Sequence, residues 1–258
     1  MITRVTSVRP RPSLATEGTR ETRSPAARAG GFVVLLVALA AAVLASLAVG
    51  TRAIPPAEVL QILLGNDTGA NASVINDLRV PRTLIGLVAG AALGVSGALI
   101  QAVTRNPLAD PGILGVNAGA AFAMAIGTGL AGVTGSFGTL ALAYAGAFGA
   151  SVLVYAIGSL GAGGGSPVRL ILAGVALGAM LAGITSAIVL TDRARFAGMT
   201  AWQSGSLLDR DVGLLTWAGP LVLLGLGVAL AIGSSLNAIA LGDDLASALG
   251  ARVVRTRV

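Results

Sequence analysis

The sequence predicts an all-α protein that crosses a membrane several times. Hydrophobic residues make up 55% of the 258 positions and charged residues only 11%, and the mean hydropathy is +0.87. Soluble domains carry about a quarter charged residues, so this chain could not cover a folded surface of its size with charge. The charges that do occur, with arginine as the only basic residue type, leave long uncharged stretches between them.

These uncharged stretches predict about six transmembrane helices. A helix needs about 20 apolar residues to cross a bilayer. The residues between Pro111 and Val168 are all uncharged, and Gly and Thr near 132–136 divide this stretch in two. The predicted spans are 29–51, 83–104, 112–132, 137–160, 170–191 and 212–242.

Residues 1–28 are polar and contain six arginines and two glutamates, which predicts a disordered cytosolic tail. If this tail is cytosolic, the inner segments hold 11 arginines and five acidic residues, and the outer segments hold six of each. This asymmetry follows the positive-inside rule and places both termini in the cytosol. A cleaved signal sequence fits less well, because the apolar core 31–50 is longer than usual. Membrane topology explains the charge of the tail, so no nucleic-acid partner is expected.

The region after the first predicted span has its own pattern. Residues 54–65 begin with two prolines and end at Gly65, which predicts a short external helix. The polar segment 66–76 is then expected to be an external loop. The predicted domains are the tail 1–28, a transmembrane domain 29–236 and a cytosolic end segment 237–258.

Glycines recur along one face of the second predicted span, at Gly86, Gly90, Gly94 and Gly97. A four-residue spacing puts small residues on one helix face, where another helix can approach closely. The same face could line a translocation pathway, and the two roles are compatible. The segment 104–112 that follows contains Asn-Pro and Asp-Pro, which predict a tight cytosolic turn.

Missing residue types exclude several kinds of chemistry. The chain has no lysine, histidine or cysteine, so it has no P-loop lysine, no imidazole base and no thiolate ligand. No enzyme activity, bound cofactor or metal site is therefore expected. The predicted spans also contain no carboxylate, whereas ion-coupled carriers usually place ionisable groups at membrane depth. They offer neutral polar groups instead, namely Ser96, Gln101, Asn117, Ser151, Thr185 and Ser186.

The segment 241–250 predicts a second short helix. Asp243 or Asp244 suits its N-cap and Gly250 its end. Leu241, Leu245, Ala248 and Leu249 would form one apolar face. Such a helix either lies on the membrane or docks in a groove of another protein, and its physical chemistry favours neither.

Several motifs together resemble the FecCD-type permeases, the membrane subunits of ATP-binding cassette (ABC) importers for iron-siderophores, haem and vitamin B12. The resemblance runs from about residue 29 to residue 252. It is carried by Leu-Arg-Val-Pro-Arg at 78–82, the glycine run 90–97, Gln101, Asn-Pro-Leu-Ala-Asp-Pro-Gly at 106–112, Leu-Gly-Val-Asn-Ala-Gly at 114–119, Trp-Gln-Ser-Gly-Ser-Leu at 202–207 and the segment 236–250.

The resemblance implies the N-terminal part of a ten-helix permease in the cytoplasmic membrane, moving an iron-siderophore-type chelate into the cell. It implies three kinds of partner: a second permease subunit, identical or different, an extracytoplasmic binding protein, and cytosolic ATPase subunits that use ATP. Segment 237–250 would dock on the ATPase. Arg79 and Arg82 would grip acidic residues of the binding protein from the mouth of the helix.

The chain departs from the family in one respect, because the family continues with several more spans and this sequence stops at Val258. We therefore expect either a truncated product or a permease whose remaining spans lie on another polypeptide. A non-transporting membrane fragment is the main alternative. A secondary transporter is less favoured, because the predicted spans lack acidic residues.

Overall fold

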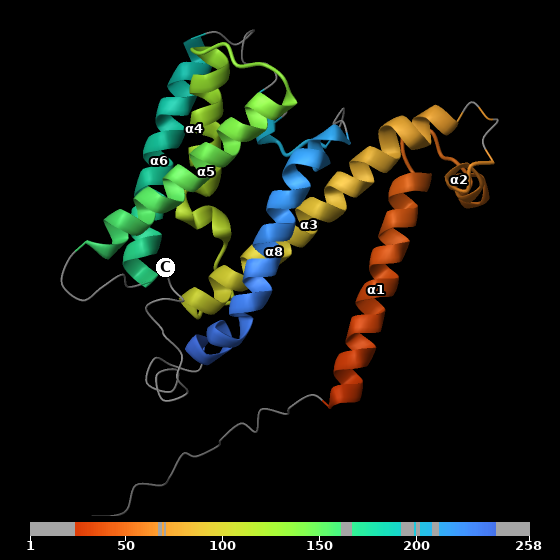
Figure 1. Cartoon of the computed structure of the whole chain (residues 1–258), viewed down its shortest axis with the longest axis horizontal. Coiled ribbons are helices and arrows are strands. Elements are labelled where there is room, and N and C mark those ends of the chain that lie inside the picture. The colour runs from red at the N-terminus through yellow and green to blue at the C-terminus, as the bar shows by residue number, and fades with distance from the viewer. Residues whose placement is uncertain are drawn as a thin grey trace, which may run out of the picture. The chain divides into compact units, whose positions relative to one another are not determined.

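The computed structural model describes residues 24–66, 69, 71–160, 167–191, 199, 202–207 and 212–240. All regular structure in these residues is helical, which confirms the predicted all-α class. The elements are α1 (Pro25–Ala48), α2 (Pro56–Leu63), the π-helical turn η1 (Val74–Arg79), α3 (Val80–Thr104), the 3₁₀ turn η2 (Pro111–Leu114), α4 (Val116–Gly129), α5 (Ser136–Ser159), α6 (Pro167–Thr191) and α8 (Gly213–Ala240) (Figure 1).

Five of the helical segments are long and apolar enough to cross a membrane: Pro25–Ala48, Val74–Thr104, Ser136–Ser159, Val168–Thr191 and Gly213–Gly233. The remaining predicted span, 112–132, is shorter than expected, because its helix α4 has only 14 residues. At 1.5 Å per residue it is about 21 Å long, less than the ~30 Å of the hydrocarbon core. The predicted range 112–132 was too long because its first residues form η2 and its last follow the helix end at Gly129.

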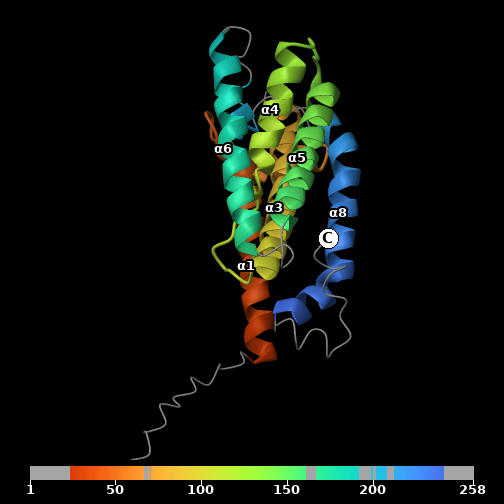
Figure 2. The same cartoon turned by 90° about the vertical axis from the view of Figure 1, so that its left-hand side faces the viewer.

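The chain forms two compact units, residues 1–46 and 47–258. The first contains most of α1, whose apolar side chains between Phe32 and Leu44 are largely exposed. In the second, α4, α5 and α6 pack against one another and lie side by side in both views (Figures 1 and 2). In the same unit α3 packs along α8, and α8 also contacts α5.

Glycines set the closest helix crossings in the second unit. A Cβ on Gly119 of α4 would collide with the backbone of Gly146 on α5 and with Ala150. A Cβ on Gly174 of α6 would lie 3.0 Å from the Cα of Leu114 in η2. Small residues let backbones approach in this way, and here they bring α4 close to α5 and η2 close to α6.

The predicted glycine face of α3, unlike Gly119 and Gly174, does not lie against another helix among the described residues. A Cβ at Gly90, Gly94 or Gly97 would meet no described atom within 4 Å, and one at Gly86 would only touch Leu207 at 3.5 Å. Within the described residues this face therefore makes no close helix crossing. A packing or pathway role for these glycines stays a prediction.

Several predicted boundaries shift. Helix α1 begins at Pro25, where Ser24 Oγ accepts a hydrogen bond from the Ala27 amide (3.2 Å), so residues 25–28 are helical and not part of a disordered tail. The predicted loop 66–76 is already helical from residue 72 onward, and η1 leads directly into α3. The short external helix is confirmed as α2, with Gly65 in a left-handed conformation (φ 81°) just beyond its end.

The predicted turn after α3 is confirmed in detail. Arg105 ends the helix in a left-handed conformation (φ 52°). Asn106 Oδ1 then accepts from the Leu108 amide (2.9 Å), and Asp110 Oδ1 accepts from the Gly112 amide (2.7 Å). These two side chains satisfy backbone donors of the turn and start η2 beside α4.

Candidate functional site

Arg79, at the end of η1, is buried and fully engaged with backbone. Its side chain is only 5% exposed. Nη1 donates to the carbonyl of Leu47 (2.6 Å), in the last turn of α1, and Nη2 donates to the carbonyl of Arg52. The last carbonyls of a helix lack intrahelical partners and carry partial negative charge, so a guanidinium is a favourable cap for them.

Gly50 makes room for this cap. A Cβ at this position would lie 2.9 Å from Nη2 of Arg79. The guanidinium thus ties residues 47–54 to the start of the α3 segment, and the Ile54 amide adds a bond to the Ala48 carbonyl (2.9 Å). We call Arg79, Gly50 and the carbonyls of Leu47 and Arg52 the Arg79 cap.

The geometry corrects one expectation. The side chain of Arg79 does not project from the mouth of the helix, because its guanidinium is buried and donates to the carbonyls of Leu47 and Arg52. Arg82, in the first turn of α3, is partly exposed. Docking of a binding protein by these two arginines is an untested prediction.

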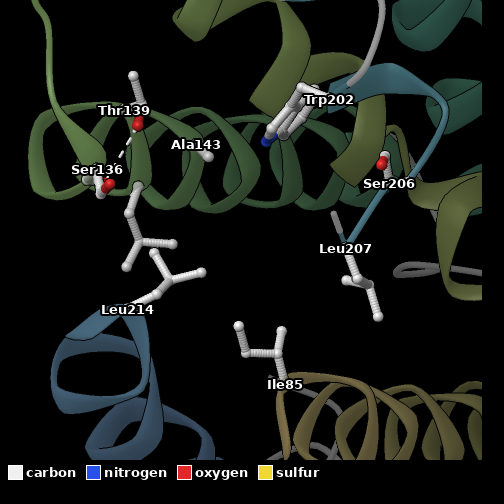
Figure 3. A pocket seen from close by; sticks show the side chains of 10 residues that line it. Ile85, Ser136, Thr139, Ala143, Trp202, Ser206, Leu207 and Leu214 are labelled. Atoms are coloured by element: carbon white, nitrogen blue, oxygen red, sulfur yellow. Dashed lines mark hydrogen bonds between the residues drawn. The ribbon is translucent and has the colours of Figure 1, made fainter. Parts of the chain in front are cut away.

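A cavity of about 280 Å³ lies where α3, α5, α8 and the segment 202–207 meet. Figure 3 shows Trp202 and Ser206 approaching it from that segment, with Ile85 of α3 and Leu214 of α8 opposite. The hydroxyl of Thr139 lines it as well and donates to the carbonyl of Ser136 (3.1 Å). The cavity is therefore part apolar and part polar.

A second cavity, of about 610 Å³, lies between α4, α6 and the same segment. Its polar lining consists of Asn117, Thr185, Ser186 and Gln203, and Trp202 forms part of its wall. No charged side chain is among the described residues that line it. Trp202 and Gly205 line both cavities, so the two spaces adjoin at these residues. We call the larger space the Trp202 cavity.

Thr185 is the unusual residue of the Trp202 cavity. Its side chain is 3% exposed, and its Oγ1 has no hydrogen-bond partner among the residues that the structure describes. The great majority of buried polar side-chain atoms in proteins are hydrogen-bonded, so each exception needs an explanation.

Two other spaces have a different character. One of about 650 Å³ lies between α3, α5, η2 and the start of α6, and one of about 550 Å³ follows the α4–α5 crossing. Phe148, Val154 and Leu170 contribute to the first. Its two serines bond to their own helices, Ser96 to the Leu93 carbonyl (3.0 Å) and Ser151 to the Ala147 carbonyl (2.9 Å). These grooves therefore present apolar surface.

The comparisons with known proteins agree with the bundle of apolar helices. The model of the FecCD transport family matches residues 37–258. The chain belongs to the FecCD transport family. As in other permeases of this kind, the chain is a multi-pass protein of the cytoplasmic membrane.

Individual relatives sharpen this assignment. The ferric enterobactin transport system permease protein FepD of Escherichia coli K12 is 47% identical over 224 residues, which are 87% of this chain and 67% of FepD. The probable siderophore transport system permease protein YfiZ of Bacillus subtilis 168 is 34% identical over 85% of this chain and 66% of its own length. The chain thus spans about two thirds of the length of these relatives.

A solved structure supports the same fold. It shows an inward-facing conformation of a metal-chelate type ABC transporter, with a TM-score of 0.68 and 27% sequence identity. The match covers 88% of this chain and 68% of that one. Helices α3, α4, α5, α6 and α8 of this FecCD chain therefore have a permease arrangement.

The neutral polar residues that the sequence singled out lie in three different surroundings. The structure brings Asn117, Thr185 and Ser186 together at the Trp202 cavity, whereas Ser96 and Ser151 lie at an apolar groove. Gln101 is exposed near the end of α3. Sequence reasoning noted residues 202–207 only as a family motif and missed that Trp202 and Gln203 wall a cavity.

Two further predictions concern the ATPase-docking segment 241–250 and metal binding. The proposed ATPase-docking residues Leu241, Asp243, Asp244, Leu245, Leu249 and Gly250 lie outside the described residues. Within the part of the chain that the structure describes, no three acidic side chains gather closely enough to hold a metal ion.

Proposed function

We propose that this FecCD chain forms the membrane pathway of an ABC importer that carries an iron chelate into the cell. The observation that carries the proposal is the 47% identity to the ferric enterobactin permease over most of the chain. Ferric enterobactin is therefore the first cargo to test. The chain spans about two thirds of that relative, so we assign the activity to the assembled importer.

The chemistry of the spans favours an external energy source. Beyond the first turns of α3 and α6, the described helices α3, α4, α5, α6 and α8 contain no Asp, Glu or Arg. Carriers driven by protons or ions usually keep ionisable groups at membrane depth. ATP hydrolysed by a cytosolic partner is the energy source that fits these neutral helices.

Three partners complete the proposed importer. A second permease subunit forms the other wall of the pathway, and the ATPase docks on the segment 241–250 through Leu241, Leu245 and Leu249. An extracytoplasmic binding protein docks near Arg82, whose planar guanidinium suits a carboxylate on the partner. Arg79 contributes there by holding the adjoining turn in place.

Uptake of ⁵⁵Fe-labelled ferric enterobactin tests this proposal. Cells that lack their own ferric-chelate permease should regain uptake when this chain is expressed with its companion subunits, and lose it when the partner ATPase carries an inactive ATP site. Uptake that survives the inactive ATPase but stops with a protonophore would instead identify a secondary transporter. A normally inserted chain that supports no uptake with any companion would be a non-transporting fragment.

A further inference from the structure

We propose that α2 is a membrane-surface helix, which seats three leucines in the phospholipid leaflet at the start of α3. Leu60, Leu63 and Leu64 are 58%, 46% and 68% exposed. Residues three and four apart share one side of a helix, so these side chains form a single apolar patch. We call it the α2 leucine patch. A lone exposed leucine is ordinary, but three on one side of a helix too short to cross the membrane call for a covering partner.

The opposite side of α2 is already occupied by protein. Val59 and Ile62 are buried, and α2 packs against η1, beside the start of α3 (Figure 1). Nδ2 of Asn71, just before η1, donates a hydrogen bond to Oε1 of Glu58 in the first turn of α2 (2.6 Å). Helix α2 is therefore fixed to the segment that begins α3, while its leucine patch faces away from that contact.

The length of α3 indicates the depth of this contact. Residues 83–104 are uncharged, and at 1.5 Å per residue they span about 33 Å, close to the ~30 Å of the hydrocarbon core. Arg82 therefore lies at one boundary of the core. The headgroup layer beyond it is about 5–8 Å deep on each side of the bilayer. Because η1 ends at Arg79, less than one turn before Arg82, η1 reaches into this layer.

The depth of η1 sets the level of the α2 leucine patch. Since α2 packs against η1, the patch lies where headgroups meet the acyl chains and not in open water. It thus continues the lipid-facing surface of the span Val74–Thr104, to which η1 belongs. In the predicted topology with both termini in the cytosol, this leaflet is the outer one.

The chemistry of the patch matches this boundary. Helices that lie on a membrane bury their apolar side about 5–10 Å into the region between headgroups and acyl chains. The only charged residue of α2 is Glu58, which is bonded to Asn71 on the protein side. A partner recognised through charge would therefore find nothing to bind on the patch, whereas acyl chains require only apolar surface.

Spin labelling of the full chain in vesicles of phosphatidylethanolamine and phosphatidylglycerol tests the proposal. The parent has no cysteine, so Leu60→Cys and Leu64→Cys each provide a single position for a nitroxide. Gln61→Cys is the matched control for Leu60→Cys, because Gln61 is also exposed and lies about 100° further around the same helix. All three side chains are exposed, so the label displaces no packed group.

Molecular oxygen concentrates in lipid, whereas a water-soluble nickel chelate stays outside it. We expect nickel to reach the label at position 60 or 64 severalfold less than the label at position 61, and oxygen to reach positions 60 and 64 more than nickel does. Equal nickel access at all three positions would place the patch in water. Low access of both reagents at positions 60 and 64 would show that a second copy of the chain covers the patch. Either result overturns the proposal.

A depth measurement separates a surface helix from one that lies within the core. A bimane fluorophore on Leu60→Cys should be quenched more strongly by phospholipids brominated near the headgroup than by those brominated near the chain end. Stronger quenching from the chain end would place α2 inside the hydrocarbon core, and no quenching by either lipid would remove α2 from the membrane. Both outcomes contradict a helix seated at the surface.

Discussion

The Arg79 cap and the Trp202 cavity both bury a polar side chain, but they treat it in opposite ways. Arg79 is 5% exposed and donates to two backbone carbonyls. Thr185 is 3% exposed, and its hydroxyl has no partner in the described part of the chain. Burial alone therefore does not reveal a residue's role here. The paired guanidinium at the cap holds the protein chain in place, whereas the hydroxyl of Thr185 makes no such contact with the described residues.

The largest effect is expected from breaking the cap with Arg79→Met. This change leaves the carbonyls of Leu47 and Arg52 without their donor, and each unsatisfied group costs about 1–3 kcal/mol. We expect the free energy of unfolding of the purified protein to fall by about 2–5 kcal/mol in total. A thermal or denaturant unfolding curve in detergent measures it.

Arg79→Lys is the control for this prediction, because an ammonium keeps the charge but lacks the planar fork that reaches two carbonyls. It should recover part of the lost stability. If Arg79→Met unfolds like the parent, the guanidinium is not a structural cap, and the earlier expectation of an outward-facing docking residue regains its place.

A smaller effect is expected from crowding the cap with Gly50→Ala. The added Cβ would lie 2.9 Å from Nη2 of Arg79, so the guanidinium must shift away from its carbonyls. Overpacking of this kind typically costs about 1–3 kcal/mol, and the mobile end of a long side chain places this case near the lower limit. The same unfolding measurement detects it.

A double-mutant cycle sharpens this prediction. In the Arg79→Met background, Gly50→Ala should cost clearly less than in the parent, because the group it collides with is gone. Equal costs in both backgrounds would show that Gly50 is required for the local backbone and not for the guanidinium.

The two arginines of the 78–82 motif should also separate in a docking measurement. Arg82 is partly exposed, and surface ion pairs are worth about 0.2–1 kcal/mol. Arg82→Glu adds repulsion to that loss. We therefore expect the affinity of the binding protein for importer-containing membranes to fall severalfold, more strongly at low salt than at high salt. An unchanged affinity would make Arg82 an ordinary anchor at the membrane surface.

How far the sequence predicted these regions depends on the distance between the residues concerned. Hydropathy, charge and the Asn-Pro and Asp-Pro pairs are local signals, so they located the apolar helices and the turn at 104–112. Arg79 looked like an outward docking residue because its carbonyl partners lie 27 and 32 residues away in the sequence. A close helix crossing likewise needs small residues on both helices. The glycine spacing on α3 therefore could not reveal that Gly119 of α4 meets Gly146 of α5.

The cavity was predictable only in part. The absence of charge in the spans singled out Asn117, Thr185 and Ser186 as polar exceptions. Their assembly with Trp202 and Gln203 depends on how α4 and α6 pack and on where the segment 202–207 returns. Nothing in the local pattern around residue 202 gives that position.

The smallest effect concerns the stability of the Thr185→Val variant, and it completes the contrast with Arg79. Valine has nearly the shape of threonine, so no cavity is created and no atom is crowded. The removed hydroxyl has no partner among the described residues, so no protein hydrogen bond is lost, and an unpaired polar atom is replaced by a methyl group. We therefore expect the free energy of unfolding without cargo to stay within about 0.5 kcal/mol of the parent or to rise slightly, as for a change that breaks no contact.

Thr128→Val is the comparison, because the Thr128 hydroxyl is bonded to the Met124 carbonyl and its loss should cost up to about 1 kcal/mol. Thermal unfolding of the two variants beside the parent measures the difference. A Thr185→Val protein that is destabilised more than Thr128→Val would show that the hydroxyl of Thr185 has a structural partner, and the two buried polar groups would then no longer be opposites.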